Sequence, residues 1–186
     1  MLRIFTLTSL FLFSCVGSAN QPTPLYQIDM IIFAHQSNAS NQTDDTTLPL
    51  LTPHRQHAIS LQSSDGDTIT PYHLLPPSSS HLHSEYWALN HKQNYQVLAH
   101  YTWLQPSNNQ QSIALPPIHS TSWNVEGTLR IRQSNYYLLD TDLLFSAPGG
   151  RQTAFMFSHK QRLKPGTVYY LDHPQAGMLI KVQQIA

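Results

Sequence analysis

The chain has 186 residues, ten of them Lys or Arg and ten Asp or Glu, and only 11% are charged. A near-neutral chain without a dense basic patch does not suit nucleic acid, so we exclude that class of partner. With 40% hydrophobic residues, this length is enough for a single domain with one sizeable core.

The N-terminus has the three-part pattern of a cleavable secretory signal. Arg3 supplies a positive charge, residues 4–16 are mostly apolar, and Gly17-Ser18-Ala19 offers small residues for cleavage. We expect a signal peptide over residues 1–19 and a single domain over residues 20–186. No later run reaches the roughly 20 apolar residues that a membrane span needs, so we expect no transmembrane segment after signal removal. Cys15 matches a bacterial lipoprotein box only loosely, and we do not expect a lipid anchor there.

The first strand is predicted at residues 26–33. Tyr26, Ile28, Met30 and Ile32 share one face, while the other face begins polar and ends apolar with Phe33. That pattern predicts an interior strand that is covered on both sides at one end.

A long polar insert is predicted at about residues 36–80. The composition there changes to Ser, Thr, Asn, Asp and Pro with scattered leucines, which is typical of loop or disordered chain. Structureless loops of this length are uncommon inside a domain, so residues 48–51 and 58–61 are candidates to dock onto the body.

A short amphipathic helix and a second strand follow. Leu82, Tyr86 and Leu89 recur at helical spacing, with Ser80 or Ser84 as the cap. Period-two alternation then predicts a strand over residues 95–103, with its five odd-numbered residues, Tyr95 to Trp103, on one face.

The next two strands form the best-defined hairpin. Leu129 and Ile131 form one apolar face, and the apolar positions of residues 137–145 form another. Because a one-residue slip turns a strand over, these two faces coincide only if the loop between the strands has an odd number of residues. We expect a three-residue loop with Asn135 in the left-handed conformation. This register places Arg130 directly or diagonally across from Asp140.

Strands are also predicted at residues 153–163, 168–171 and 178–182. Gly166 permits the Pro-Gly turn before the last two, Asp172-His173-Pro174 ends one strand, and Gly177 permits the return of the chain. The whole is predicted to be α+β, a mostly antiparallel twisted sheet with one main helix.

Catalytic and metal chemistry find little support in the sequence. The pairs His54/His57 and His81/His83 have no cysteine or acid at ligand spacing beside them, so we predict no metal site. No phosphate-binding glycine loop or nucleophile elbow is present, and we predict no cofactor. One enzymatic alternative stays open, an exported hydrolase or metal-dependent enzyme that uses Asp140, Asp142 and His173.

Aromatic and cationic side chains are the stronger binding candidates. Tyr169 and Tyr170 place one ring on each face of their strand, so one of them stays available to stack on a ligand. From residue 124 onward the chain has seven basic and four acidic residues, a net charge of +3. The cations that we expect to contact carboxylates are Arg130, Arg132 and Arg162.

Residues 162–182 resemble the signature of the CsiV family of gammaproteobacteria, cell-shape-integrity proteins that bind peptidoglycan. The chain supplies Arg162, Leu163, Lys164, Gly166, Tyr170, Leu171, Asp172, His173, Pro174, Gly177, Leu179 and Val182 in step with that signature. Three further blocks agree in order: YQIDMIIFAHQ, YQVLAHYTW and GTLRIRQSNYYLLDTDLLF. Three positions depart from the pattern: Asn135, Thr167 and Ala176.

The resemblance implies a periplasmic, non-enzymatic protein that binds peptidoglycan and supports wall synthesis and cell shape. It also implies partners, a penicillin-binding protein and its outer-membrane lipoprotein activator. A second alternative is an envelope adaptor that binds proteins without contacting glycan, which would be captured from an envelope extract even after digestion of the wall.

Overall fold

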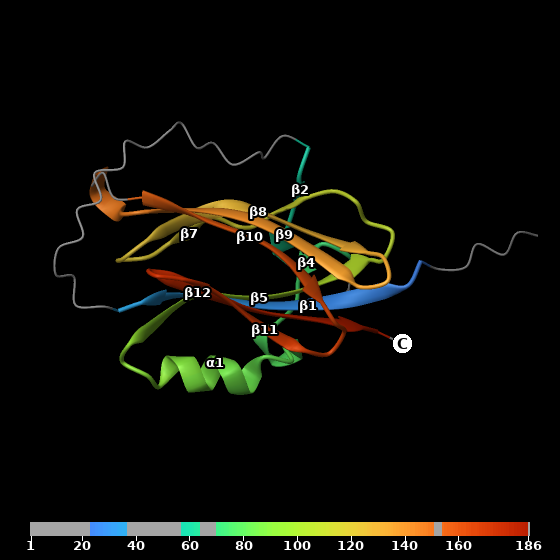
Figure 1. Cartoon of the computed structure of the whole chain (residues 1–186), viewed down its shortest axis with the longest axis horizontal. Coiled ribbons are helices and arrows are strands. Elements are labelled where there is room, and N and C mark those ends of the chain that lie inside the picture. Colours follow the sequence, from blue (N-terminus) through green and yellow to red (C-terminus); the bar gives the residue numbers. More distant parts are fainter. Residues whose placement is uncertain (1–22, 37–56, 64–69, 151–153, 186) are drawn as a thin grey trace, which may run out of the picture.

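The computed structural model describes residues 23–36, 57–63, 70–150 and 154–185. Two β-sheets pack face to face, and helix α1 (His83–Asn90) lies on the outer face of one of them, which gives three layers (Figure 1). Within the described part of the chain, no helix is long and apolar enough to cross a membrane. The predicted signal segment, including Cys15, lies outside the described residues.

The helix-covered sheet, here sheet A, has six strands. Their spatial order is β11 (Val168–His173), β12 (Ala176–Gln184), β1 (Leu25–His35), β5 (Tyr95–Pro106), β4 (His73–Leu74) and β3 (Gln62–Ser63). In sheet B the order is β10 (Ala154–Leu163), β9 (Tyr137–Ser146), β8 (Asn124–Gln133), β6 (Ile113–Ala114) and β2 (Ile59–Ser60), with β7 (Ile118–His119) also paired to β8.

The predicted fold class is confirmed in its coarse form, a mostly β protein with one α-helix among the described residues. One detail was wrong, since the strands form two packed sheets instead of one. The pairing is mostly antiparallel, as predicted, although β2–β6 and β3–β4 are short parallel pairs. Both parallel pairs include a short strand from the segment that was predicted as a polar insert.

Strand β1 occupies the interior position that its sequence predicts. Ile28, Met30 and Ile32 face the core between the sheets, whereas Ile31 and Phe33 face α1, where Leu82, Tyr86 and Leu89 cover them. The N-terminal end of the strand is also covered, since Gln27 and Asp29 are buried. Burial on both faces therefore extends from Tyr26 to Ala34.

The predicted hairpin is strands β8 and β9. Leu129, Ile131 and Leu139 are buried between the sheets, and the loop has the predicted three residues, because Gln133 pairs with Tyr137. The prediction of a left-handed Asn135 is wrong, since among the described non-glycine residues only His57 and Tyr72 have positive φ. The loop is closed instead by a hydrogen bond from the Ser134 N–H to the Tyr136 carbonyl (2.8 Å).

Strand β5 forms at the predicted place, but its faces are not as predicted. Ala99 pairs with Ile32 while Val97 pairs with Phe33, so Leu98 is an extra residue in a β-bulge. A bulge shifts the alternation by one residue. Ala99, Tyr101 and Trp103 therefore face the core between the sheets, whereas Tyr95 and Val97 face the helix side of sheet A.

Part of the predicted insert is built into the sandwich. Strand β2 belongs to sheet B and β3 to sheet A, so residues 59–63 cross from one sheet to the other. Leu61, at the crossing, is buried in the shared core, and Ile59 packs against it. The predicted docking of residues 58–61 is thus confirmed, while residues 48–51 lie outside the described residues.

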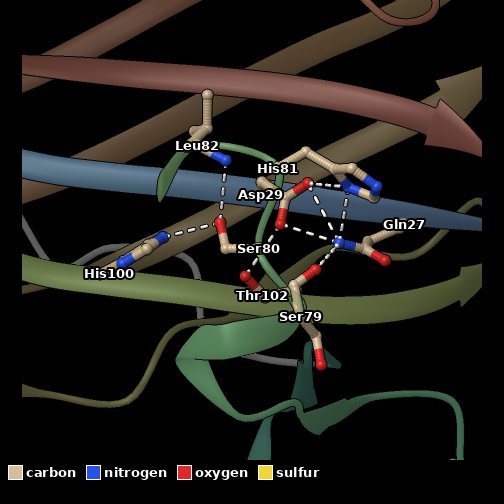
Figure 2. Close-up of polar contacts among 8 residues, drawn as sticks. All are labelled: Gln27, Asp29, Ser79, Ser80, His81, Leu82, His100 and Thr102. Atoms are coloured by element: carbon tan, nitrogen blue, oxygen red, sulfur yellow. Dashed lines mark hydrogen bonds and ion pairs between the residues drawn. The ribbon is translucent and has the colours of Figure 1, made fainter. Parts of the chain in front are cut away.

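The segment that leads into α1 is held by a buried carboxylate. Figure 2 shows Asp29 of β1 beneath this segment, fully buried and accepting hydrogen bonds from Thr102 Oγ1 (2.9 Å) and Gln27 Nε2 (3.0 and 3.2 Å). His81 Nδ1 lies 3.1 Å from the same carboxylate. The cap prediction was wrong, since the N-cap of α1 is Leu82, without a side-chain capping bond, and neither Ser80 nor Ser84 holds that position. Ser80 instead accepts from the Leu82 N–H (3.1 Å) and contacts His100 Nε2 (2.7 Å).

Candidate functional site

The closing hairpin places the aromatic candidates. Its Pro-Gly turn contains Gly166, whose positive φ of 72° suits glycine and whose N–H donates to the Val182 carbonyl (2.8 Å). Strand β11 continues through Asp172 and His173, which pair with Gly177 and Ala176, and the chain turns at Pro174 and Gln175. Asp172 and His173 are therefore the last residues of the strand, and Pro174 follows its end.

Tyr169 and Tyr170 point to opposite faces of sheet A, as predicted. Tyr169 packs against the core between the sheets, and its hydroxyl accepts from the Lys164 N–H (2.9 Å). Tyr170 lies on the helix side and is 52% exposed. Of the two rings, that of Tyr170 is the more exposed.

Four rings on the helix side of sheet A form an aromatic platform, which we define as Phe33, His35, Tyr95 and Tyr170. The buried Phe33 ring lies beneath Tyr170, with a centroid distance of 6.1 Å and an interplanar angle of 12°. Tyr95 meets Phe33 edge-on at 5.3 Å and His35 at 5.6 Å. The platform thus extends from edge strand β11 to the start of β5.

Gly177 leaves the space in which two of these rings meet. A Cβ atom on this residue would lie 2.5 Å from Cζ of Phe33 and 2.9 Å from Cε2 of Tyr170. Both distances are too short, so a side chain here would displace the Tyr170 ring. The glycine predicted to let the chain return therefore also allows the platform to form.

We expect Gly177→Ala to lower the free energy of unfolding by about 1–3 kcal/mol, because overpacking displaces the buried Phe33 ring. The same change should move Tyr170 out of parallel alignment, which near-ultraviolet circular dichroism of the folded variant would detect. Gly149→Ala is the control for the spectrum, since its φ of 78° adds backbone strain but a Cβ there meets nothing within 4 Å and displaces no ring. Equal spectral changes in both variants would contradict this account.

A polar edge adjoins the platform. The Tyr170 hydroxyl donates to Oδ1 of Asp172, and partial burial together with this bond raises the pKa of Tyr170 above its usual value. His35 Nε2 lies 3.8 Å from the same oxygen and is buried without a hydrogen-bond partner among the described residues. The edge therefore offers a carboxylate and an unsatisfied imidazole nitrogen beside an exposed ring.

A depression of about 690 Å³ borders the platform at Tyr95. Its walls come from the residue after β1, the end of α1 and the start of β5, and most of its side chains carry amide or basic nitrogen groups: Gln36, Asn90, His91, Lys92, Gln93, Asn94. Amides both donate and accept hydrogen bonds, so they suit a ligand rich in hydroxyl and amide groups. Together with the flat Tyr170 ring, this surface suits a sugar with amide substituents.

The three arginine candidates lie elsewhere. Arg130 and Arg132 of β8 and Arg162 of β10 line one groove on the outer face of sheet B. Figure 1 shows that face on the side of the molecule opposite α1. The predicted contact between Arg130 and Asp140 is confirmed, with Nη2 to Oδ2 at 2.7 Å. The structure therefore brings the arginines together but separates them from Tyr170.

The residues of the enzymatic alternative do not converge. Asp140 pairs with Arg130, and Asp142 accepts from the Ser158 hydroxyl (2.7 Å), both on the outer face of sheet B. His173 instead stacks on Phe155 on the inner side, at 4.3 Å between centroids, where burial lowers its pKa. No acid–base pair forms from these three side chains.

The histidine pairs do not form a metal site in the part of the chain that is described. No group of three or more His, Cys, Asp and Glu there could hold a metal ion. His81 contacts Asp29, whereas His83 lies against Trp87 (6.1 Å between rings). His54 lies outside the described residues.

Sequence reasoning missed Phe33, His35 and Tyr95 as members of the site. The sequence signal for Phe33 is the apolar end of the otherwise polar face of the first strand. Tyr95 was assigned to the opposite face because the alternation was read through the bulge at Leu98.

Comparison with known proteins adds a family to this geometry. No curated protein and no solved structure matches the chain significantly. The family model described as "Peptidoglycan-binding protein, CsiV" matches residues 5–185, nearly the whole chain. This match covers every strand that carries the platform, and the chain belongs to the CsiV family of peptidoglycan-binding proteins.

Proposed function

We propose that this protein binds peptidoglycan, with the aromatic platform as the contact for its sugars. The observation that carries this proposal is the exposed Tyr170 ring, held nearly parallel to Phe33 above Gly177. A ring fixed in this way loses little conformational entropy when a sugar stacks on it. The adjacent amide-lined depression would bind the hydroxyl and acetamido groups of neighbouring sugars.

The role that we propose is non-enzymatic. Family membership supports binding, and the residues considered for catalysis lie on opposite sides of sheet B. We place the protein in the periplasm, where peptidoglycan lies and to which the predicted signal would direct it. There it would support wall synthesis and cell shape by promoting a penicillin-binding protein together with its outer-membrane lipoprotein activator.

Co-sedimentation with purified sacculi tests the binding claim. The wild-type protein is expected to pellet with sacculi well above an unrelated exported protein of similar size. Tyr170→Phe should pellet like the wild type, since it keeps the ring and loses only the hydroxyl bond to Asp172. Wild-type protein that stays in the supernatant at the level of the unrelated protein would refute the proposal.

A further inference from the structure

The outer face of sheet B carries one short row of cations on each side of strand β9. The β-sheet register places Arg132, Leu138 and Arg162 side by side across three strands. The next three register partners that face outward across the same strands are Arg130, Asp140 and Lys160. Arg130 and Arg132 therefore stand on one side of β9, with Lys160 and Arg162 on the other.

These side chains enclose a groove of about 350 Å³. Strands β8 and β10 are each one strand away from β9, so the two cationic rows stand about 10 Å apart. Leu138 provides an apolar floor between Arg132 and Arg162. A groove of this width and composition suits an extended chain that carries anionic groups on both sides.

The groove has more positive charge than its own acid can neutralise. Asp140 is the one acid among the groove residues and is already bound by Arg130. The Nε atoms of Arg130 and Arg132 are buried and have no hydrogen-bond partner among the described residues. The Arg130 side chain is nevertheless 36% exposed, so an incoming anion can accept charged hydrogen bonds from the exposed part of the guanidinium.

One of the cations is also held in position. The Arg162 guanidinium lies over the Tyr136 ring, 5.3 Å from its centroid, which limits the orientations available to the guanidinium group. Tyr136 belongs to the β8–β9 loop at the same end of the sheet. Arg132 and Arg162 therefore face each other across Leu138 with planar groups suited to bidentate carboxylate recognition.

We infer that this groove binds carboxylates of the peptide part of peptidoglycan, as a second wall-binding site separate from the aromatic platform. This inference rests on the proposed function, since it assumes that the wall is the ligand. The wall's peptides carry carboxylates along an extended chain, which matches two cationic rows with an apolar floor. The two sites lie on the outer faces of different sheets, so one molecule contacts two wall segments at once.

The test compares two double variants on two preparations of sacculi. Arg132→Gln with Arg162→Gln removes two groove cations and leaves the Arg130–Asp140 pair intact. Lys164→Gln with Lys181→Gln removes the same charge from positions that do not line the groove. Sacculi are used either untreated or with their carboxylates converted to neutral amides, and thermal melts confirm that both variants fold.

On untreated sacculi, the groove variant should bind about tenfold more weakly than the wild type, which is the effect of losing one charged hydrogen bond between an arginine and a wall carboxylate. The affinity of the lysine control should change little. On amidated sacculi, the wild type should fall to the level of the groove variant. Equal binding of the groove variant and the wild type to untreated sacculi would overturn the inference, as would wild-type binding that amidation leaves unchanged. Tyr170→Ala separates the two claims: if it weakens binding while the groove variant does not, the groove inference fails and the platform proposal stands.

Discussion

Asp29→Ala is expected to lower the free energy of unfolding by roughly 3 kcal/mol or more, measured by urea denaturation. The carboxylate is fully buried and accepts from Thr102 and Gln27, which are themselves buried. Without it, the buried Thr102 hydroxyl loses its acceptor, while the Gln27 amide keeps its bond to the Ser79 carbonyl (2.8 Å). His81, 3.1 Å from the carboxylate, also loses its contact, so the segment leading into α1 loses one of its attachments to the sheet.

The matched control is His81→Ala, which removes a partner from the same cluster. The His81 side chain is 40% exposed, so water can replace its contact with Asp29 and the cost should stay below about 1 kcal/mol. A change of less than 0.5 kcal/mol for Asp29→Ala, on the order of a typical surface substitution, would show that the buried network contributes little.

Gly127→Ala is expected to disrupt sheet B, with a loss that reaches or exceeds about 3 kcal/mol in urea denaturation. A Cβ on Gly127 would overlap the carbonyl oxygen of Asp142 and lie 2.8 Å from Cα of Leu143. Both are backbone atoms of the paired strand β9, so no side-chain rotation can relieve the overlap. The two strands would have to separate at the point where Gly127 pairs with Leu143.

Gly166→Ala is the appropriate comparison. Its Cβ would meet nothing within 4 Å, but its φ of 72° is one that alanine adopts at a cost of about 1–2 kcal/mol. The two variants separate loss of space from backbone strain. If Gly127→Ala were no less stable than Gly166→Ala, the close approach of β8 and β9 would not be the cause.

The local elements could be predicted where apolar alternation is regular. The strand around Ile28 and Met30, the helix around Tyr86 and the register of Arg130 with Asp140 all follow from side-chain period. The presence of two sheets could not be predicted this way, because alternation shows that a face is buried but not what covers it. The bulge at Leu98 was equally hidden, since its cause is the pairing with a strand about 65 residues earlier in the chain.

The candidate site could be predicted only in part. Tyr170 was identified because neighbouring residues in a strand point to opposite faces, whichever face is buried. The platform beneath it depends on Phe33 and Gly177, which come together only through the pairing of β1 with β12. The arginines were expected to act with the tyrosines, yet Arg130 and Tyr170 lie on different sheets, a separation that only tertiary structure decides.

The affinity of Tyr170→Ala for purified sacculi, set against that of Trp87→Ala, tests the central claim most directly. Both rings are similarly exposed, at 52% and 48%, but Trp87 lies on α1 outside the platform. Loss of a stacking ring predicts binding about tenfold weaker for Tyr170→Ala, while Trp87→Ala binds like the wild type. Wild-type affinity in Tyr170→Ala, or an equal loss in both variants, would contradict the assignment of the platform as the wall-binding site.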